Sequence, residues 1–393
     1  MSGNIAAPGS QSSLREANSA RIVDTVKRYG RITQVELASA TGLSAATVSN
    51  IVKQLTSQGV VQTQTTIRSG RRAQLVTLAR STGLALGIEV GRRQMRLELS
   101  DAAHESTAHQ HLPLPVDHRV DTTLDRAALL VMELTEGIGA TLDDVIGVGV
   151  SLPAPVDPVT GLISVPGIMP GWDDVDVGEV LRRRLNRPVV VDNDANAGAL
   201  GESRFGALRG VAMGIYVRCS YMTGGGIIMD GHVLHGDRGI AGEIGHVQVD
   251  PTGPICRCGS RGCLNTIVGA DMIVDLLRLT RGRMSLQDVI HSANEGDPGC
   301  RQVIQDAGSA IGNVLADLCM ALAPTVIVVG GELAQTGETL LSPIRDAVGG
   351  RPLLGGKVEV VPSELGDRAE VLGALAMAQD AGEPAYVHKE AIS

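Results

Sequence analysis

A strand–turn–strand pattern occurs twice in this chain of 393 residues. The first copy consists of the apolar run 84–90, a turn and a second run at 95–99, and the second consists of 211–217, a turn and 224–230. Helical patterns separate and follow the two copies. Strands that alternate with helices predict an α/β fold with mixed sheets. Two similar halves also predict a cleft between them, where ligands usually bind.

The segments around the two copies have helical or strand patterns of their own. We expect helices at 126–137, 177–185, 270–279 and 307–322, and strands at 145–150, 189–191 and 324–331. Aromatic residues make up only 2% of the chain, so the cores must consist mainly of Val, Ile, Leu and Ala.

The first 80 residues differ in charge from the rest of the chain. They contain 10 Lys and Arg but only 3 Asp and Glu, whereas the whole chain has a net charge of −9. A basic segment joined to an acidic body is typical of a protein in which one module binds nucleic acid. A chance fluctuation of charge is the alternative.

The basic segment also has the pattern of a helix-turn-helix. A first helix ends at Gly30, and Thr33 with Glu36 then forms a capping box at the start of a second helix. Ser44 caps a third helix over 45–57. A short helix, a glycine turn and a longer helix in this order indicate a DNA-binding unit.

Two predicted strands, 60–65 and 74–78, follow as a hairpin with a basic tip, which is the pattern of a wing. We expect the third helix to enter the major groove and the wing to enter the minor groove. The expected DNA contacts are Ser44, Ala45, Ala46, Thr47, Ser49, Asn50 and Lys53 on the third helix, and Arg68, Arg71 and Arg72 in the wing. A three-helix interaction domain with a solvated charged face is the alternative.

One His and three Cys residues have the spacing of a metal site. Cys256, Cys258 and Cys263 lie close together, and His246 precedes them across a turn rich in Pro and Gly. Three thiolates and one imidazole suit tetrahedral Zn²⁺, and four protein ligands leave no open position for catalysis. We therefore expect one structural Zn²⁺ per chain. Reduced thiols without a metal are the alternative.

From residue 18 to about residue 380 the chain resembles the ROK family (repressor, open reading frame, kinase). The segment 242–264 has the spacing of the zinc signature of that family, and 192–196, 330–331 and 365–367 also match. The resemblance implies an α/β, two-lobed, actin-like sugar-kinase fold. We divide the chain into a disordered tail at 1–17, a winged helix-turn-helix domain at 18–80, a ROK effector domain at 84–380 and a tail at 381–393.

The resemblance also implies which residues bind a sugar. Asp194 corresponds to the general base of the family kinases, and Asn193, Glu243 and His246 match sugar-contacting positions. Asn265 stands where the family has a sugar-contacting Glu, so the identity of the sugar does not transfer from the family to this chain.

Two turns that approach ATP phosphates in the family kinases have lost glycines here. Arg92 and Arg93 occupy the first turn, and Tyr221 and Met222 occupy the second. Each of these side chains adds a Cβ atom where the backbone must nearly touch a phosphate oxygen. Phosphoryl transfer depends almost wholly on such positioning, so we expect no kinase activity and a sugar hydroxyl held by Asp194.

The same turns have gained cations. Arg92 and Arg93 in the first turn, and Arg218 before the second, predict a binding site for a 6-phosphate on the effector, because the planar guanidinium group suits phosphate. The alternative is that these arginines are exposed to solvent or paired with acids such as Glu89.

We therefore expect a cytoplasmic regulator of transcription that forms a homodimer or homotetramer and acts as a repressor. It would bind a double-stranded DNA operator and be released by a sugar or sugar-phosphate effector. We expect no contact with a membrane, because no run of 18 apolar residues and no signal peptide is present. Two other functions remain open: an active sugar kinase with an added DNA-binding module, and a regulator controlled by a partner protein.

Overall fold

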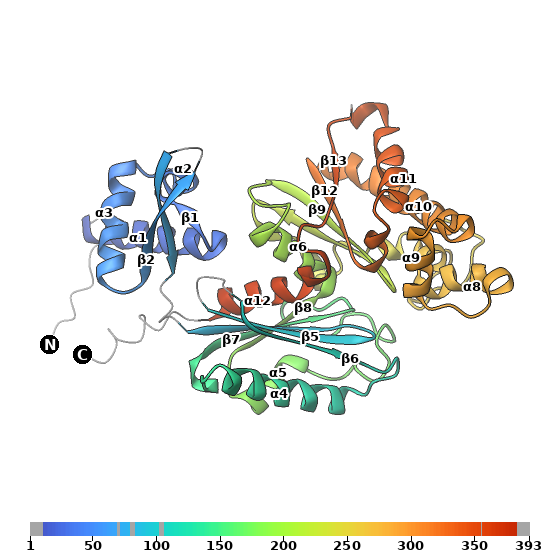
Figure 1. The fold of residues 1–393 in the computed structure, drawn as a ribbon, viewed down its shortest axis with the longest axis horizontal. Coiled ribbons are helices and arrows are strands. Elements are labelled where there is room, and N and C mark those ends of the chain that lie inside the picture. Colours follow the sequence, from blue (N-terminus) through green and yellow to red (C-terminus); the bar gives the residue numbers. More distant parts are fainter. Residues whose placement is uncertain (1–10, 69–70, 79–82, 102–105, 355, 383–393) are drawn as a thin grey trace.

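The computed structural model describes residues 11–68, 71–78, 83–101, 106–354 and 356–382. They form a small N-terminal unit of helices and a short sheet, followed by two larger lobes that each contain a five-stranded sheet (Figure 1). Among these residues, no helix is both long and apolar enough to cross a membrane.

The N-terminal unit is a winged helix-turn-helix. Its elements are α1 (Gln11–Tyr29), β1 (Ile32–Thr33), α2 (Gln34–Thr41), α3 (Ala45–Ser57), β2 (Val61–Arg68) and β3 (Arg71–Leu78). The predicted capping box is present, since the backbone N–H of Thr33 donates to Oε2 of Glu36 at 2.8 Å. The backbone N–H of Thr47 donates to Oγ of Ser44 at 3.1 Å, which caps α3 as predicted. A separate apolar core forms where Ile22, Leu37, Val48 and other residues pack together.

Helix α1 corrects the expectation that residues 1–17 form a tail. The helix begins at Gln11, so 11–17 are helical. The reason is local, because Pro8 and Gly9 disfavour a helix, whereas the following residues include none of either and several good helix formers. Residues 1–10 and 79–82, and most of the predicted C-terminal tail (383–393), lie outside the described residues.

The first lobe contains the sheet β6-β5-β4-β7-β8. Its strands are β4 (Leu84–Val90), β5 (Gln94–Asp101), β6 (Ser106–Pro113), β7 (Val145–Leu152) and β8 (Val189–Asn193). Helices α4 (Val120–Gly137) and α5 (Val177–Leu185) cover one face. Strand β6 was not predicted, because it is a polar, largely exposed edge strand without an apolar alternation.

The second lobe repeats this topology with the sheet β11-β10-β9-β12-β13. Its strands are β9 (Met213–Cys219), β10 (Thr223–Met229), β11 (His232–Val233), β12 (Val326–Gly330) and β13 (Glu359–Pro362). In both lobes the first three strands form an antiparallel meander, and the last two are parallel to the first. The predicted repeat of strand, turn and strand is therefore confirmed as two lobes with the same strand order.

Helices of the second lobe lie on the outer face of its sheet. They are α7 (Asn265–Val268), α8 (Ala270–Arg281), α9 (Leu286–Asn294), α10 (Pro298–Leu322) and α11 (Glu338–Gly349). Helix α10 is longer than predicted, because Asp297 accepts a hydrogen bond from the backbone of Cys300 and begins the helix before 307. The short 3-10 helices are Leu142–Asp144, Asp237–Gly239, Ile244–His246, Glu332–Thr336, Pro352–Leu354 and Gly366–Arg368.

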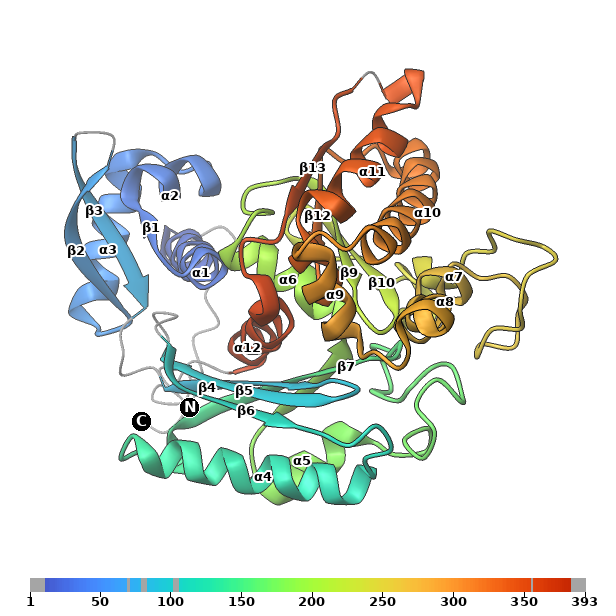
Figure 2. The ribbon, with the colours of Figure 1, turned by 45° about the vertical axis from the view of Figure 1, so that its right-hand side comes forward.

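Helices α6 (Asp194–Phe205) and α12 (Ala369–Ala381) pack against each other between the lobes (Figure 2). Helix α6 lies on β9 and β10, and α12 lies on β4 and β7. Glycines allow these contacts: a Cβ atom on Gly373 would lie 1.7 Å from the carbonyl oxygen of Ala197, and one on Gly149 would lie 1.8 Å from that of Ala374. Helix α6 also contacts α1 of the N-terminal unit.

Because the two helices touch through glycines, adding a single methyl group at this interface should strongly reduce thermal stability. Gly373→Ala should lower the melting temperature by several degrees, because overpacking a rigid contact costs about 1–3 kcal/mol. Gly137→Ala is the matched control, because its added Cβ meets nothing within 4 Å at the end of α4. Thermal unfolding of both variants checks this, and equal melting temperatures would contradict the close approach of α6 and α12.

Candidate ligand cleft, metal centre and DNA-binding surface

A cavity of about 270 Å³ lies between the two lobes. The turns after β4 and β9, the N-terminal ends of α6 and α12, and the residues that follow β12 line it. This volume is slightly below the range of roughly 300–1,000 Å³ found for drug-sized ligands, so the cavity suits a small molecule.

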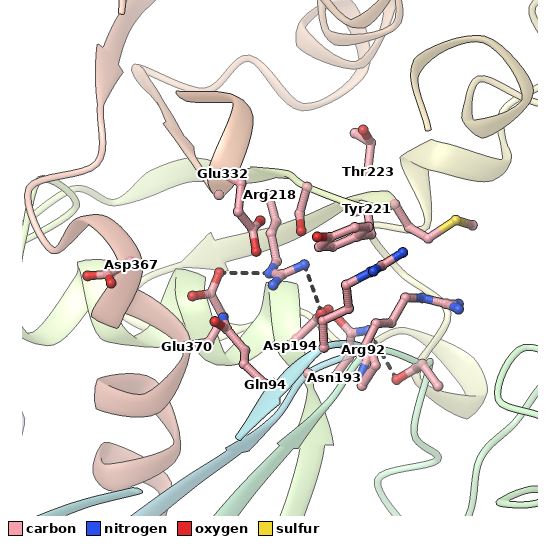
Figure 3. Close-up of a pocket in the computed structure, with 18 of the residues that line it drawn as sticks. Arg92, Gln94, Asn193, Asp194, Arg218, Tyr221, Thr223, Glu332, Asp367 and Glu370 are labelled. Carbon is pink, nitrogen blue, oxygen red and sulfur yellow. Dashed lines mark hydrogen bonds and ion pairs between the residues drawn. The ribbon is translucent and has the colours of Figure 1, made fainter. Parts of the chain in front are cut away.

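Asn193 and Asp194 lie at the N-terminal end of α6, on the floor of the cavity (Figure 3). The side-chain oxygen of Asn193 accepts hydrogen bonds from the backbone of Ala195 and Asn196, and its amide group donates to the carbonyl oxygen of Ala154 at 3.0 Å. Asn193 is therefore the N-cap of α6 as well as a cavity residue. Burial raises the pKa of Asp194, and the charge of nearby Arg218 opposes this shift.

Arg218, on β9, is a buried cation that three carboxylates surround. Its Nε lies 3.0 Å from Oε1 of Glu370, and its Nη1 lies 3.3 Å from Oδ2 of Asp194 (Figure 3). Its Nη2 lies 3.8 Å from Oε1 of Glu89. The hydroxyl of Tyr216 donates to the same oxygen of Glu370 at 2.8 Å. Burial, and then the charge of Glu370, raises the pKa of Glu89 to about 7.

Glu243 and His246 face each other near the cavity, with 3.8 Å between Oε2 of Glu243 and Nε2 of His246. Burial raises the pKa of Glu243 to about 7, and burial also lowers the pKa of His246. Asn265 lines the cavity too, but its amide group is already paired on both sides. It accepts from the backbone N–H of Thr223 at 2.7 Å and donates to the carbonyl oxygen of Thr223 at 3.2 Å, so it mainly fixes the start of β10.

Arg92 and Arg93 lie in the turn after β4 and line the cavity. Arg92 is half-buried and donates to the carbonyl oxygen of Ile168 at 3.3 Å, and Arg93 lies over the ring of Tyr221 at 5.0 Å. Burial, and then the charge of Arg257, lowers the pKa of Arg92. Neither arginine forms an ion pair within the part of the chain that the structure describes, unlike Arg218.

The four predicted metal ligands converge. The donor atoms of His246, Cys256, Cys258 and Cys263 all lie within 4.8 Å of one another. The Sγ atoms of Cys258 and Cys263 are 3.7 Å apart, and Nδ1 of His246 is 3.5 Å from Sγ of Cys256. Bonds of about 2.3 Å at a tetrahedral angle separate two sulfurs by about 3.8 Å, so the arrangement fits a tetrahedral metal ion. Since Nδ1 faces the thiols, Nε2 of His246 is left to face the cavity side.

The exposed face of α3 and the wing form the candidate DNA-binding surface. Ala45, Ala46, Asn50 and Lys53 are exposed on α3, whereas Thr47 and Ser49 are half-buried. The hydroxyl groups of Ser44 and Thr47 are 2.8 Å apart, so the cap already uses both. In the wing, the backbones of Arg68 and Arg71 are opposite each other in the ladder of β2 and β3, and Arg72 is exposed. The tip at 69–70 lies outside the described residues.

Several cavity residues were missed at the sequence level. Glu370 on α12 and Glu332 after Gly331 line the cavity, as do Gln94 and Arg96 on β5. Two of them could have been predicted from the sequence. Glu332 follows the glycine turn after a predicted strand, and Gln94 follows the first turn in which glycines are replaced. Glu370 gives no such signal, because nothing in the pattern of α12 shows that its first turn meets Arg218.

Comparison with known families agrees with this architecture. The ROK family model matches residues 85–381, and a model described as winged helix-turn-helix DNA-binding matches residues 16–62. The chain is 31% identical to the DNA-binding transcriptional dual regulator NagC of Escherichia coli K12, over 96% of both chains. It is 28% identical to the xylose repressor of Bacillus subtilis 168, over 92% of this chain and 95% of the repressor.

Solved structures show the same fold. A ROK family transcriptional regulator, a homologue of the E. coli MLC protein, superposes with a TM-score of 0.74 at 24% identity and covers 94% of this chain and 96% of its own. A ROK family glucokinase from Streptomyces griseus, in complex with glucose and AMPPNP, superposes with a TM-score of 0.66 at 27% identity, over 76% of this chain and 100% of its own. The chain therefore belongs to the ROK family and carries an N-terminal winged helix-turn-helix.

Proposed function

We propose that this protein is a transcriptional repressor whose binding to operator DNA is controlled by a sugar or sugar phosphate in the cleft between its lobes. The observation that carries the proposal is the presence, in one chain, of an exposed α3 with a wing and of a two-lobed cleft. Two relatives that match this chain over more than nine-tenths of its length support the proposal, because one is named an N-acetylglucosamine repressor and the other a xylose repressor.

The DNA-binding half is proposed to be residues 18–80, and the effector half residues 84–380. Ser44, Ala45, Ala46, Thr47, Ser49, Asn50 and Lys53 would meet the major groove, with Arg68, Arg71 and Arg72 in the minor groove. A homodimer or homotetramer would place two such units on the half-sites of a pseudo-palindromic operator.

In the effector half, Asn193, Asp194, Glu243, His246 and Asn265 surround the proposed sugar site. Carboxylates accept hydrogen bonds from hydroxyl groups, and a ligand without matching hydroxyls would leave these buried groups unpaired. The side chain of Asn265 is hydrogen-bonded to the backbone of Thr223. We therefore expect Asn265 to fix the shape of the site near Thr223 more than to select the ligand.

The finer proposal is that the effector carries a phosphate near Arg92 and Arg93. Both line the cavity and lack ion pairs among the described residues, so their guanidinium groups can receive an anion. Arg218 was predicted to bind the phosphate with them, but Asp194, Glu370 and Glu89 already neutralise its charge.

We also propose that the cleft has no kinase activity. The side chains of Tyr221 and Met222 occupy the second phosphate turn, and Arg218 contacts Asp194, the residue at the position of the general base in the family kinases. The ion pair with Arg218 occupies an oxygen of the carboxylate that would otherwise be free to accept the proton of a sugar hydroxyl. The alternative is an active sugar kinase with an added DNA-binding module. An assay for ATP consumption distinguishes the two functions.

The metal is proposed to be one structural Zn²⁺ per chain, held by His246, Cys256, Cys258 and Cys263. When bound, such an ion cross-links the loop and leaves no coordination position free for chemistry. This chain would then use the ion to fix the ring of His246, so that Nε2 stays directed to Glu243 and the cavity.

DNA binding is tested with two variants that should behave differently. Arg72→Ala should weaken operator binding and lower the slope of log affinity against log salt by about one, because one phosphate contact is lost. Asn50→Ala should instead reduce the preference for operator over unrelated DNA by roughly 1–3 kcal/mol. Fluorescence anisotropy over a salt series measures both, with Arg345→Ala, far from α3, as control. Unchanged affinity and specificity in both variants would contradict the assignment.

The metal site is tested by Cys258→Ser. Loss of one thiolate should reduce the zinc content from one per chain and lower the melting temperature, because metal binding is linked to folding. Cys300→Ser, a buried thiol outside the cluster, is the control and should keep its zinc. Elemental analysis of protein purified without chelators is the measurement, and wild-type protein free of zinc would exclude the site.

Control by a sugar is tested by titrating operator complexes with free hexoses, pentoses and N-acetylhexosamines, and with the 6-phosphates of the hexoses and hexosamines. We expect one compound to release DNA, its 6-phosphate to act at lower concentration, and Arg92→Ala to narrow that difference. ATP consumption should stay at background with every sugar. If no sugar releases DNA but a protein from lysate does, control by a partner protein replaces this proposal.

A further inference from the structure

Three buried carboxylates lie at the floor of the cleft or just beneath it, around Arg218. Asp194, Glu370 and Glu89 are each less than 9% exposed, and they come from α6, α12 and β4. Like charges this close cannot all ionise in a low dielectric unless a cation compensates them. These three elements also include both helices that join the lobes, so the charge is placed where the lobes meet.

Arg218 is the cation that contacts all three carboxylates. Arg96 contacts only Glu89 in this group, at 3.3 Å, and its other partner is the exposed Asp367. Asp194 has no other ion pair with an arginine or lysine among the described residues. Although burial opposes it, the charges of Asp194 and Glu370 keep the pKa of Arg218 well above its ordinary value. Among the nearby charges, Arg218 therefore contributes most to favouring the ionised form of Asp194.

We propose that Arg218 is a built-in counter-cation that holds Asp194 ionised and fixed on the cleft floor, and that joins the two lobes around it before any ligand binds. Arg218 is thus a positioning residue. It makes Asp194 an acceptor only, so the group that meets Asp194 in a ligand must be a donor such as a hydroxyl or an amide N–H. The last point rests on the proposed function, whereas the role of Arg218 as counter-cation does not.

The proposal predicts how stability changes with pH when the cation is removed. In Arg218→Met, Asp194, Glu370 and Glu89 become buried carboxylates without their shared partner. Their folded pKa values, which burial already raises in the wild type, rise further. A group with a raised folded pKa stabilises the fold below its unfolded pKa and loses that contribution as pH rises through the folded pKa. The variant should therefore be close to wild type at low pH and lose stability progressively toward pH 8.

Other charges near this cluster enter the same balance. Glu332, beyond β12, adds a negative charge that raises the pKa of Glu89 and favours the charged form of Arg218. The charge of Arg92, in the turn after β4, lowers the pKa of Asp194. The hydrogen bond from the hydroxyl of Tyr216, on β9, lowers the pKa of Glu370. None of these groups changes in the variant, so the predicted difference from wild type belongs to Arg218.

The first measurement is thermal unfolding of the full chain from pH 5.5 to 8.5. At pH 8, Arg218→Met should melt roughly 5–10 °C below wild type, because an uncompensated buried charge is costly, and less than half of that difference should remain at pH 5.5. Arg218→Lys should recover at least half of the loss at pH 8. Arg351→Met is the matched control, because it removes an exposed ion pair with Asp317, and its shift should be within about 2 °C at every pH.

The second measurement is a double-mutant cycle with Asp194→Asn. In the wild-type background this change removes a partner of Arg218 and should lower the melting temperature. In the Arg218→Met background it removes an unpaired buried charge, so at pH 8 it should raise the melting temperature. If Arg218→Met does not fold at pH 8, the cycle is run with Arg218→Lys, where Asp194→Asn should cost less than it does in wild type.

Two results would overturn the proposal: a deficit of Arg218→Met that does not change with pH, or an equal loss from Asp194→Asn in both backgrounds. Either would mean that Arg218 contributes only packing. None of these measurements uses DNA or a sugar. Failure here therefore leaves the repressor function standing, and failure of the sugar titration leaves the role of Arg218 standing.

Discussion

The close packing of α6 against α12 is the contact on which the rest of the structure depends. Each helix lies on the sheet of a different lobe, and glycines let backbone meet backbone at their interface and at the sheet beneath α12. Leu200 and Met377 pack at the same interface, and the first turn of each helix lines the cleft. Asp194 and Glu370 can then share one cation, and the cavity exists because these two helix ends and the turns of both sheets surround it.

Much of this architecture could be predicted from local patterns. The repeat of apolar strands predicted two similar lobes, and both caps of the helix-turn-helix could be read from Thr33, Glu36 and Ser44. Such signals lie within a few residues of each other along the chain. The four zinc-type ligands also converge as their spacing predicted, since a short turn links the His to the Cys residues.

The parts that could not be predicted depend on contacts between distant segments. Glu370 is separated from Arg218 by 152 positions, and its helix has no periodicity that marks the first turn as functional. Asn265 lines the cavity, and its pairing with the backbone of Thr223, 42 positions earlier, becomes visible only in the folded chain. The edge strand β6 escaped for another reason, because a solvated strand needs no apolar alternation.

Helix α6 begins at Asp194 in the cleft, and it also contacts α1 of the DNA-binding unit. It has 12 residues, so its length is about 18 Å. Considered as a lever that pivots at its cleft end, it would convert a tilt of about 5° into a movement of about 1.6 Å at its far end. Displacements of 1–2 Å between packed helices are enough to switch other proteins between discrete states. In the proposed response to an effector, a ligand that tilts α6 about its cleft end would move the contact with α1 directly, in addition to any movement passed along the connecting chain.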